Sequence, residues 1–331
     1  MVSLPFLDPV VGKHLTQFMS FRRRIFLWGS VIGLVVLVIV LGLMISQHKH
    51  YMDARLNAVQ DYQEAFHGDV FHVLTFVRAG ENQAFMEPLA NLVQVAQDTE
   101  GTLIYAGQVI QMALKSQQIS ETFGESLDWQ AILVQQFDDQ DAYRTYLERP
   151  TITDALAQFE VTYTHGFERP ATLNVLLPQM LLARKLWRQL TFSPDILPFQ
   201  PSPDLDRESQ DASLAVQQQA KKLGKDAILI VNLIRQGSAD EQAANAAYSA
   251  AMLDLMADVG YGPLHMATTV SLEHDHQFDD AMLVYYPGSE YFSKMYASTW
   301  FQGIRGDKQL ADTQACMTVP ITNLLLGLVG D

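Results

Sequence analysis

The densest group of residues able to do chemistry is the stretch EHDHQ, residues 273–277. It sets His274 and His276 beside Glu273 and Asp275. On an extended segment, side chains at positions i and i+2 point the same way, and imidazole with carboxylate can bind zinc or copper. Only two histidines are present, however, and the stretch falls between two predicted strands. A solvated hairpin turn explains it better, so we expect no metal, with His274 and His276 as the only metal-ligand candidates.

A second group surrounds His265, which lies on or near a predicted strand with Tyr261 four residues before it. A histidine beside a tyrosine in a cleft can transfer protons, and Trp300 would help to line such a cleft. These three residues are the catalytic candidates. A histidine with satisfied hydrogen bonds inside a core explains the same pattern more simply, and this alternative also applies to His72 and His165.

Aromatic residues are dense between positions 285 and 301. They could line an apolar pocket, with ligand-binding candidates Tyr285, Tyr291, Tyr296 and Phe301. Aromatic residues at this density also form ordinary cores, so the pattern alone does not separate a pocket from packing.

Motifs that identify the common enzyme classes are missing from the sequence. It contains no Walker loop, Rossmann glycine fingerprint, Gly-x-Ser-x-Gly elbow or His-Glu-x-x-His, and no Cys-x-x-Cys-His for haem attachment. The single cysteine, Cys316, excludes an intramolecular disulfide and lies in the apolar run ACMTVPI, which favours a buried thiol. We therefore expect no cofactor.

An uncharged stretch from Ile25 to Ser46 predicts a membrane span. As a helix it would measure about 33 Å, enough to cross a hydrocarbon core of about 30 Å. A cleaved signal peptide is the alternative, but its apolar region is usually shorter and ends in a small-x-small site. The following residues, SQHKHYMDAR, offer no such site, so we predict an uncleaved single-pass anchor in the cytoplasmic membrane that contacts the lipid bilayer through Ile25–Ser46.

Charge predicts the orientation of this anchor and excludes one class of partner. Four basic residues precede the span (Lys13, Arg22, Arg23, Arg24) and two follow it closely (Lys49, Arg55), which places the N-terminus in the cytoplasm and residues 47–331 outside it, in the periplasm of a Gram-negative cell. Residues 1–46 hold four of the 22 Lys and Arg and one of the 37 Asp and Glu, leaving 18 and 36. Residues 47–331 are therefore strongly acidic and repel phosphate backbones, so we expect no nucleic-acid partner.

The exported part contains strands alternating with helices. In the first half, VFHVLTFVRAG (70–80) predicts a strand and FMEPLANLVQVAQDTEG a helix with one apolar face. A strand pair follows in TLIYAGQVIQMAL and WQAILVQQF, then a helix from about Asp139, and a final strand in ATLNVLLP (171–178).

The second half repeats this order. AILIVNLIRQG (227–237) matches VFHVLTFVRAG, with Arg235 for Arg78. A helix then opens on the capping pair Ser238 and Glu241, the strand pair lies in LHMATTVSLEH and AMLVYYP, Ser289 caps a further helix, and ACMTVPI is the last strand. Both halves thus predict the ferredoxin-like order β-α-β-β-α-β.

A proline-rich stretch, FSPDILPFQPSPDLDRESQ, separates the two halves and predicts an extended linker. The expected organisation is a cytoplasmic segment (1–24), a transmembrane helix (25–46), a stalk helix (47–68), a first α+β unit (69–185), a linker with a helix (186–225) and a second α+β unit (226–331).

The segment VYYPGSEYFSKMYASTWFQGIRG resembles the strand–helix segment of domain of unknown function 1330, in the dimeric α+β barrel superfamily. The likeness covers residues 226–322 and is fainter in a tandem copy at 69–179. It implies a barrel that two units build sheet against sheet, here within one chain. Strands such as AILIVNLI are apolar at consecutive positions, which agrees with burial of both sheet faces.

Two functions remain open at this stage. The first is a binding or assembly module of unknown ligand. The second is an enzyme that acts on a small hydrophobic or aromatic substrate in the second unit. The resemblance permits this function because the superfamily includes cofactor-independent monooxygenases, isomerases and haem-handling enzymes. A metal or haem carrier using EHDHQ is a third, minor alternative. Partners could be a small hydrophobic ligand, a membrane protein or a second copy of the chain.

Overall fold

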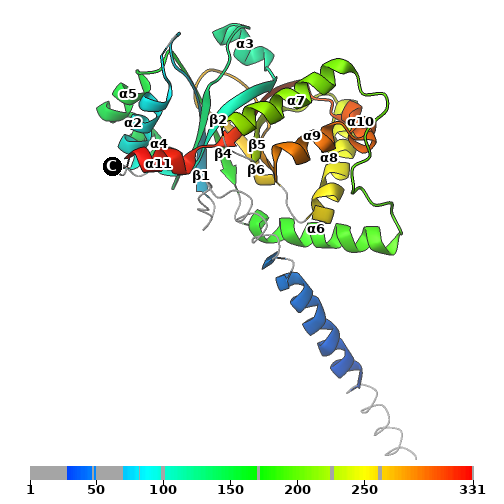
Figure 1. Cartoon of the computed structure of the whole chain (residues 1–331). Helices are drawn as coiled ribbons and strands as arrows, with labels where there is room; N and C mark the ends of the chain where they lie inside the picture. The colour runs from blue at the N-terminus through cyan, green and yellow to red at the C-terminus, as the bar shows by residue number, and fades with distance from the viewer. Residues whose placement is uncertain are drawn as a thin grey trace, which may run out of the picture. The chain divides into compact units, whose positions relative to one another are not determined.

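The computed structural model describes residues 28–46, 48–49, 70–81, 83–97, 101–169, 172–223, 227–259 and 263–329. The chain forms two compact units, Met1–Lys49 and His50–Asp331. In the first unit, Trp28–Ser46 is one helix, long and apolar enough to cross a membrane (Figure 1). The predicted cytoplasmic segment 1–24 lies outside the described residues, as does the predicted stalk 47–68 except for residues 48–49.

The second unit begins with four strands and the helices that connect them. In chain order they are β1 (Val70–Arg78), α2 (Met86–Gln97), β2 (Thr102–Leu114), α3 (Gln117–Phe123), β3 (Ala131–Phe137), α4 (Gln140–Leu147), α5 (Pro150–Leu156) and β4 (Val161–Arg169). Two further helices, α6 (Thr172–Leu190) and α7 (Arg207–Lys222), lead to the second half.

The second half repeats the strand–helix order of the first. It consists of β5 (Ile228–Arg235), α8 (Ala239–Val259), β6 (Pro263–Ser271), β7 (Asp280–Tyr286), α9 (Ser289–Tyr296), α10 (Thr299–Ile304), β8 (Asp312–Pro320) and α11 (Thr322–Val329). The residues between α6 and α7 form no helix and no strand beyond one isolated bridge at Pro201, as the prolines of that stretch predict.

The eight strands form one closed antiparallel barrel with the order β1-β3-β2-β8-β5-β7-β6-β4. Within each half the spatial order is fourth, first, third, second, which is the ferredoxin-like arrangement. Two seams join the halves: β2 pairs with β8, and β4 pairs with β6. The prediction that two similar sheets within one chain close on each other is confirmed, and the fold class is α+β.

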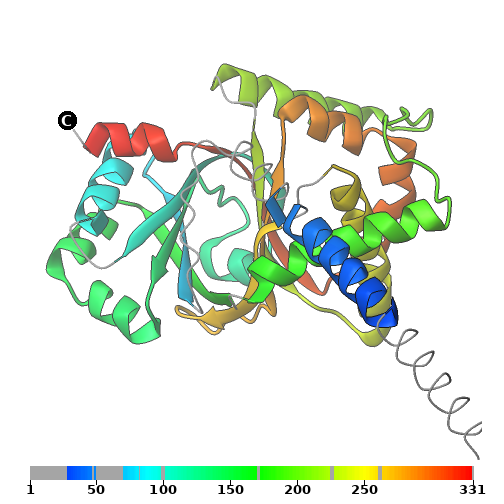
Figure 2. The same ribbon diagram turned by 90° about the horizontal axis from the view of Figure 1, so that it is seen from below.

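Burial of both faces of the sheet explains why the strands are so apolar. On β1, Leu74 and Phe76 point into the barrel with Tyr163 of β4, whereas Phe71 and Val73 point outward against α4. Helices α2, α4, α5 and α11 cover the outside of the sheet of the first half, and α6, α7, α8 and α9 cover the sheet of the other half (Figure 2). Because both faces of each sheet are buried against side chains, the strands do not show strict apolar/polar alternation.

Local signals for helix starts are mostly confirmed. The Asp139 carboxylate accepts a hydrogen bond from the Ala142 amide at the start of α4. Before α8, Ser238 and Glu241 form the reciprocal capping pair, with Ser238 N donating to Glu241 Oε2 over 2.7 Å. The predicted Ser289 cap is wrong, because Gly288 occupies that position and Ser289 is the first residue of α9, nearly fully buried.

The prediction for the last strand of the first half is also wrong. The residues expected to form it, 171–178, belong mostly to α6, and the strand is β4, ten residues earlier. β4 has the sequence VTYTHGFER, in which Tyr163 and Phe167 face the barrel while polar or small residues alternate with them. Because β4 is less hydrophobic than the apolar run that follows it, the sequence pattern favoured that run as the strand.

Candidate functional site

The barrel is filled with side chains. Its interior cluster contains 20 buried residues, among them the aromatic side chains of Phe76, Tyr105, Tyr163, Phe167 and Tyr285. Polar groups inside bond to one another: the hydroxyls of Tyr105 and Thr318 lie 2.6 Å apart, and Thr318 donates to the carbonyl of Leu229. As far as the described residues extend, the interior is therefore a packed core rather than a chamber.

Chemistry-bearing residues gather at one end of the barrel, where α3 and the loop between β6 and β7 meet. We call Phe123, Tyr163, His165, His274 and His276 the barrel-end cluster. The rings of His274 and His276 stack with centroids 5.3 Å apart, Phe123 meets His274 edge-on at 5.1 Å, and Tyr163 lies 5.4 Å from His276. Both halves of the chain contribute, because Tyr163 and His165 lie on β4 and the other two histidines follow β6.

Hydrogen bonds hold the two covering segments together. The side-chain amide of Gln118, on α3, donates to the backbone carbonyl of Gln277 over 3.1 Å and accepts from the backbone amide of Gln277 over 2.9 Å. Thr122 Oγ1 lies 2.8 Å from His276 Nε2. At the start of α3, the Asp312 carboxylate accepts bonds from the Ser116 hydroxyl and from the backbone amides of residues 117 and 118. These bonds outweigh burial, which acts to raise the pKa of Asp312, and keep that pKa below its ordinary value.

Burial governs the electrostatics of the cluster. Desolvation, together with the nearby His276, lowers the pKa of His165 to about 4, so its imidazole is neutral near pH 7. Desolvation likewise raises the pKa of Tyr163, with Glu273 adding to the effect. Tyr163 Oη and His165 Nδ1 are 3.1 Å apart, and His165 Nε2 has no hydrogen-bond partner among the described residues. A neutral tyrosine–histidine pair of this kind can accept or pass on a proton.

His274 and His276 differ in environment. His274 is exposed in a left-handed backbone conformation, with φ 55°, as expected of a turn. His276 is only 7% exposed, so the interpretation of the whole stretch as a solvated turn is wrong at this residue. Desolvation and the neighbouring His274 lower the pKa of His276. Among the described residues, no group of three or more His, Cys, Asp or Glu side chains is placed to hold a metal ion.

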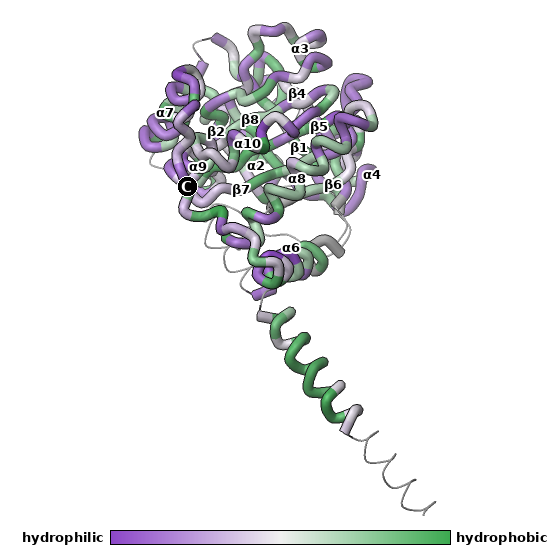
Figure 3. Tube along the Cα trace, turned by 90° about the vertical axis from the view of Figure 1, so that its right-hand side faces the viewer, coloured by the Kyte–Doolittle hydropathy of each residue, from purple (hydrophilic) through white to green (hydrophobic). Residues whose placement is uncertain are grey.

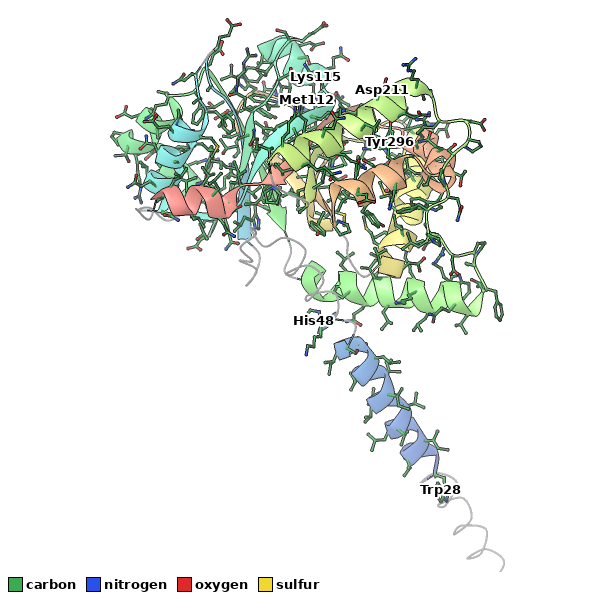
Figure 4. All side chains as sticks on the ribbon, viewed as in Figure 1. Trp28, His48, Met112, Lys115, Asp211 and Tyr296 are labelled. Atoms are coloured by element: carbon green, nitrogen blue, oxygen red, sulfur yellow. The ribbon has the colours of Figure 1, made fainter. Side chains whose placement is uncertain are left out.

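The aromatic ligand-binding candidates are divided by the wall of the barrel. Tyr285 points inside, whereas Tyr296, Phe301 and Trp300 pack in the outer cluster, where Tyr296 lies on α9 close to α7 (Figure 4). Tyr291 borders both clusters and meets Phe199 at 5.2 Å. The structure does not bring the set together around one space.

The two remaining catalytic candidates have little described structure. Tyr261 lies outside the described residues. The backbone of His265 lies in β6 and pairs with Leu283 of β7, directly after a bulge, and its side chain also lies outside the described part. The catalytic role of His265, Tyr261 and Trp300 stays a prediction.

Neither histidine inside the first half fits a haem ligand, which needs an open slot beside its ring. The ring of His72 stacks on Phe167 at 4.9 Å, and the ring of His165 meets the edge of Phe278 at 5.4 Å. Both histidines are fully buried. Neighbouring aromatic rings thus occupy the space beside both imidazoles.

A cavity of about 460 Å³ lies outside the barrel, at the C-terminal end of α6. Its lining includes two cations, Lys185 and Arg188, and two anions, Asp195 and Asp258. Arg188 donates to Asp258 over 3.2 Å. Balanced charges of this kind hold α6 in place and give no net attraction for a charged ligand.

Comparison with known protein families and with curated proteins finds no match to this sequence. Solved structures of low similarity do match. One is a mutant chlorite dismutase from Candidatus Nitrospira defluvii, with 10% identity over 78% of this chain and 95% of that chain and a TM-score of 0.40. Another is a dye-decolorizing protein from V. cholerae, with 11% identity over 78% and 96% and a TM-score of 0.40.

Likenesses of this size carry no argument about activity, and the fold assignment rests on the strand pairing itself. The dimeric α+β barrel plan is confirmed by that pairing. The narrower resemblance to domain of unknown function 1330 stays a prediction.

Proposed function

We propose that this chain is a binding or assembly module, anchored in the cytoplasmic membrane by an uncleaved helix, with its barrel on the extracytoplasmic side. Support for the anchor comes from the apolar helix Trp28–Ser46 and from the basic residues concentrated before it. Fusion of alkaline phosphatase, which is active only outside the cytoplasm, to residue 331 tests the orientation. An inactive fusion in an otherwise stable protein contradicts it.

The packed barrel interior is the observation that carries the non-catalytic part of the proposal. Enzymes and carriers that work inside a barrel keep room for a ligand, whereas the large interior side chains Tyr105, Tyr163 and Phe167 are fully buried against their neighbours. A barrel of this kind serves as a rigid scaffold that presents its outer surfaces to a partner.

Native mass spectrometry of the full chain released from detergent micelles tests this function. The expected mass is that of the bare polypeptide or a whole multiple of it, which also gives the assembly state. A stoichiometric small molecule that survives extraction and disappears only on unfolding contradicts a filled scaffold.

A second candidate function is acid–base chemistry on a small hydrophobic substrate at the barrel-end cluster. The observation that favours it is the buried His165 Nε2, which has no partner among the described residues while Nδ1 meets Tyr163. This position replaces the second unit as the preferred location, because the cluster draws on both halves. Oxygen uptake or isomerisation of hydroxyaromatic compounds by the purified chain, abolished in H165Q and Y163F, supports this function; unchanged rates in both variants exclude it.

A further inference from the structure

Helix α6 presents an unusual apolar surface to solvent. Outside the helix Trp28–Ser46, the described residues include eleven exposed large hydrophobic side chains, and six of them lie between positions 176 and 192. These six form what we call the α6 apolar face: Leu176, Met180, Leu186, Trp187, Leu190 and Phe192. Concentrated exposed apolar surface marks a contact site, whereas single exposed residues do not.

The opposite side of α6 is fixed to the barrel unit. Leu177 and Leu181 are buried in the outer cluster with Met252 and Leu255 of α8. Arg184 donates to Asp254 over 2.8 Å, which ties the same face of α6 to α8. These contacts fix the rotation of α6 about its axis, so the helix cannot turn to bury its exposed apolar residues.

Just past the end of α6, an exposed aromatic residue is held at a conformational cost. Phe192 has a left-handed backbone, with φ 52°, and its side chain is 93% exposed. Glycine is the usual residue at such a helix end, because other residues lose about 1 kcal/mol in this conformation. Trp187, one turn earlier, is 68% exposed. Tryptophan on the apolar side of an amphipathic helix is typical of helices that lie in the membrane interface.

We propose that α6 lies in the surface of the lipid bilayer, with the α6 apolar face immersed between the headgroups and the upper acyl chains. This inference rests on the membrane anchor of the proposed function. Only residues 47–69 separate the helix Trp28–Ser46 from β1, a stretch that spans at most about 80 Å when fully extended. The tether therefore keeps the bilayer at a high effective concentration near α6.

The charges of α6 agree with an electrically neutral lipid surface as the occupant. The helix contains Arg184, Lys185 and Arg188 and no acidic residue, whereas residues 47–331 as a whole are strongly acidic. Because Arg184 and Arg188 are paired with aspartates of α8, little free positive charge remains. Apolar contact therefore dominates, and zwitterionic lipid suffices. In Figure 3 the colours along α6 are mixed, whereas the helix Trp28–Ser46 is mostly hydrophobic in colour.

Site-directed fluorescence on the full chain in nanodiscs tests the proposal. Because Cys316 is fully buried, a new cysteine in L190C or F192C is the only residue that an NBD maleimide labels in the folded protein. The matched control is Q218C, at an exposed polar position of α7, which lies on another side of the same unit (Figure 1). Discs of phosphatidylcholine that hold one chain each are the reference sample.

The expected result is a shift of NBD emission to shorter wavelength and quenching by lipids brominated on the acyl chain, at positions 190 and 192 and not at 218. Adding L176Q and W187Q to the labelled chain weakens docking by about tenfold per residue removed and returns the emission toward that of the control. Since both residues are exposed, these changes leave the barrel fold intact, which circular dichroism checks.

Three outcomes overturn the proposal, and they can be told apart. Emission at 190 and 192 that equals the water-exposed control shows that α6 does not touch lipid, although the anchor holds. A shift seen only in discs that hold two chains assigns the face to a second copy. Failure of the full chain to enter discs at all removes the anchor, and with it both the proposed function and this inference.

Discussion

Acidification from pH 7 to pH 4 is expected to weaken the barrel through one buried histidine. The pKa of His165 is lowered from 6.5 to about 4 in the folded chain, chiefly because burial removes water from the imidazole. Between these two values the unfolded chain binds a proton at this residue and the folded chain does not. The free energy of unfolding therefore falls as pH falls through this window.

The size of this effect follows from the difference between the two pKa values. At about 1.4 kcal/mol for each pH unit, it amounts to about 3 kcal/mol, lost between pH 6.5 and pH 4. The buried His276, whose pKa is also lowered by desolvation, contributes in the same direction. For a domain with a typical stability of about 5–15 kcal/mol, the loss from His165 alone is a substantial fraction.

Urea denaturation of the full chain in detergent micelles, followed by tryptophan fluorescence at several pH values, measures the effect. H165Q removes the titrating group, so its stability is expected to depend less on pH between 4 and 6.5 than that of the wild type. Y163F serves as the matched control, because it loses the 3.1 Å contact with His165 but keeps the imidazole and hence the pH dependence. Equal slopes for wild type and H165Q would refute the assignment of a buried neutral imidazole.

Three further predictions concern the barrel interior. The thiol of Cys316 is fully buried and its pKa is raised to about 12 by desolvation, so a maleimide should modify it only after unfolding; rapid labelling of the folded chain would show the interior to be open. A Cβ at Gly107 would lie 2.5 Å from Tyr105 Oη and 2.8 Å from Thr318 Cβ, so G107A is expected to lose about 1–3 kcal/mol by overpacking, measured by thermal unfolding, and a variant as stable as wild type would show that these side chains yield freely. T318V removes one partner of Tyr105 Oη and the donor to the Leu229 carbonyl, and should cost about 1–3 kcal/mol in the same assay, whereas no loss would show that neither bond stabilises the barrel.

Strands with apolar residues on both faces could be predicted from the sequence. VFHVLTFVRAG and AILIVNLIRQG have consecutive apolar positions and similar ends, and both proved to be first strands of their halves, β1 and β5. Two-sided burial leaves a local signature because every residue of such a strand needs an apolar environment. The same signature correctly indicated that the sheets close on each other.

β4 could not be found in this way, because its environment is set by distant segments. Thr164 alternates with the inward Tyr163, and its amide donates to Glu273 from the loop after β6. Gly166 is required because a Cβ there would lie 2.6 Å from the ring of Phe71. Both constraints come from residues far along the chain, and the apolar run after β4 offered a stronger but misleading local pattern.

The barrel-end cluster shows the same limit. His276 was named as a metal-ligand candidate and His165 was interpreted as a core histidine, but their proximity depends on barrel closure. Phe123 gave no signal, since the position of α3 depends on hydrogen bonds to residues distant in the sequence, among them Asp312, His276 and Gln277. A sequence identifies chemically capable side chains, whereas the register of the two seams decides which of them meet.

Amide hydrogen exchange of the full chain in nanodiscs tests most directly whether the two halves close into one barrel. The seam segments 165–168 with 268–271 and 107–114 with 315–320 are expected to exchange as slowly as 71–77 with 131–137, the paired strands within the first half. Fast exchange at both seams, beside slow exchange within each half, would show two separate sheets with open edges and contradict the account.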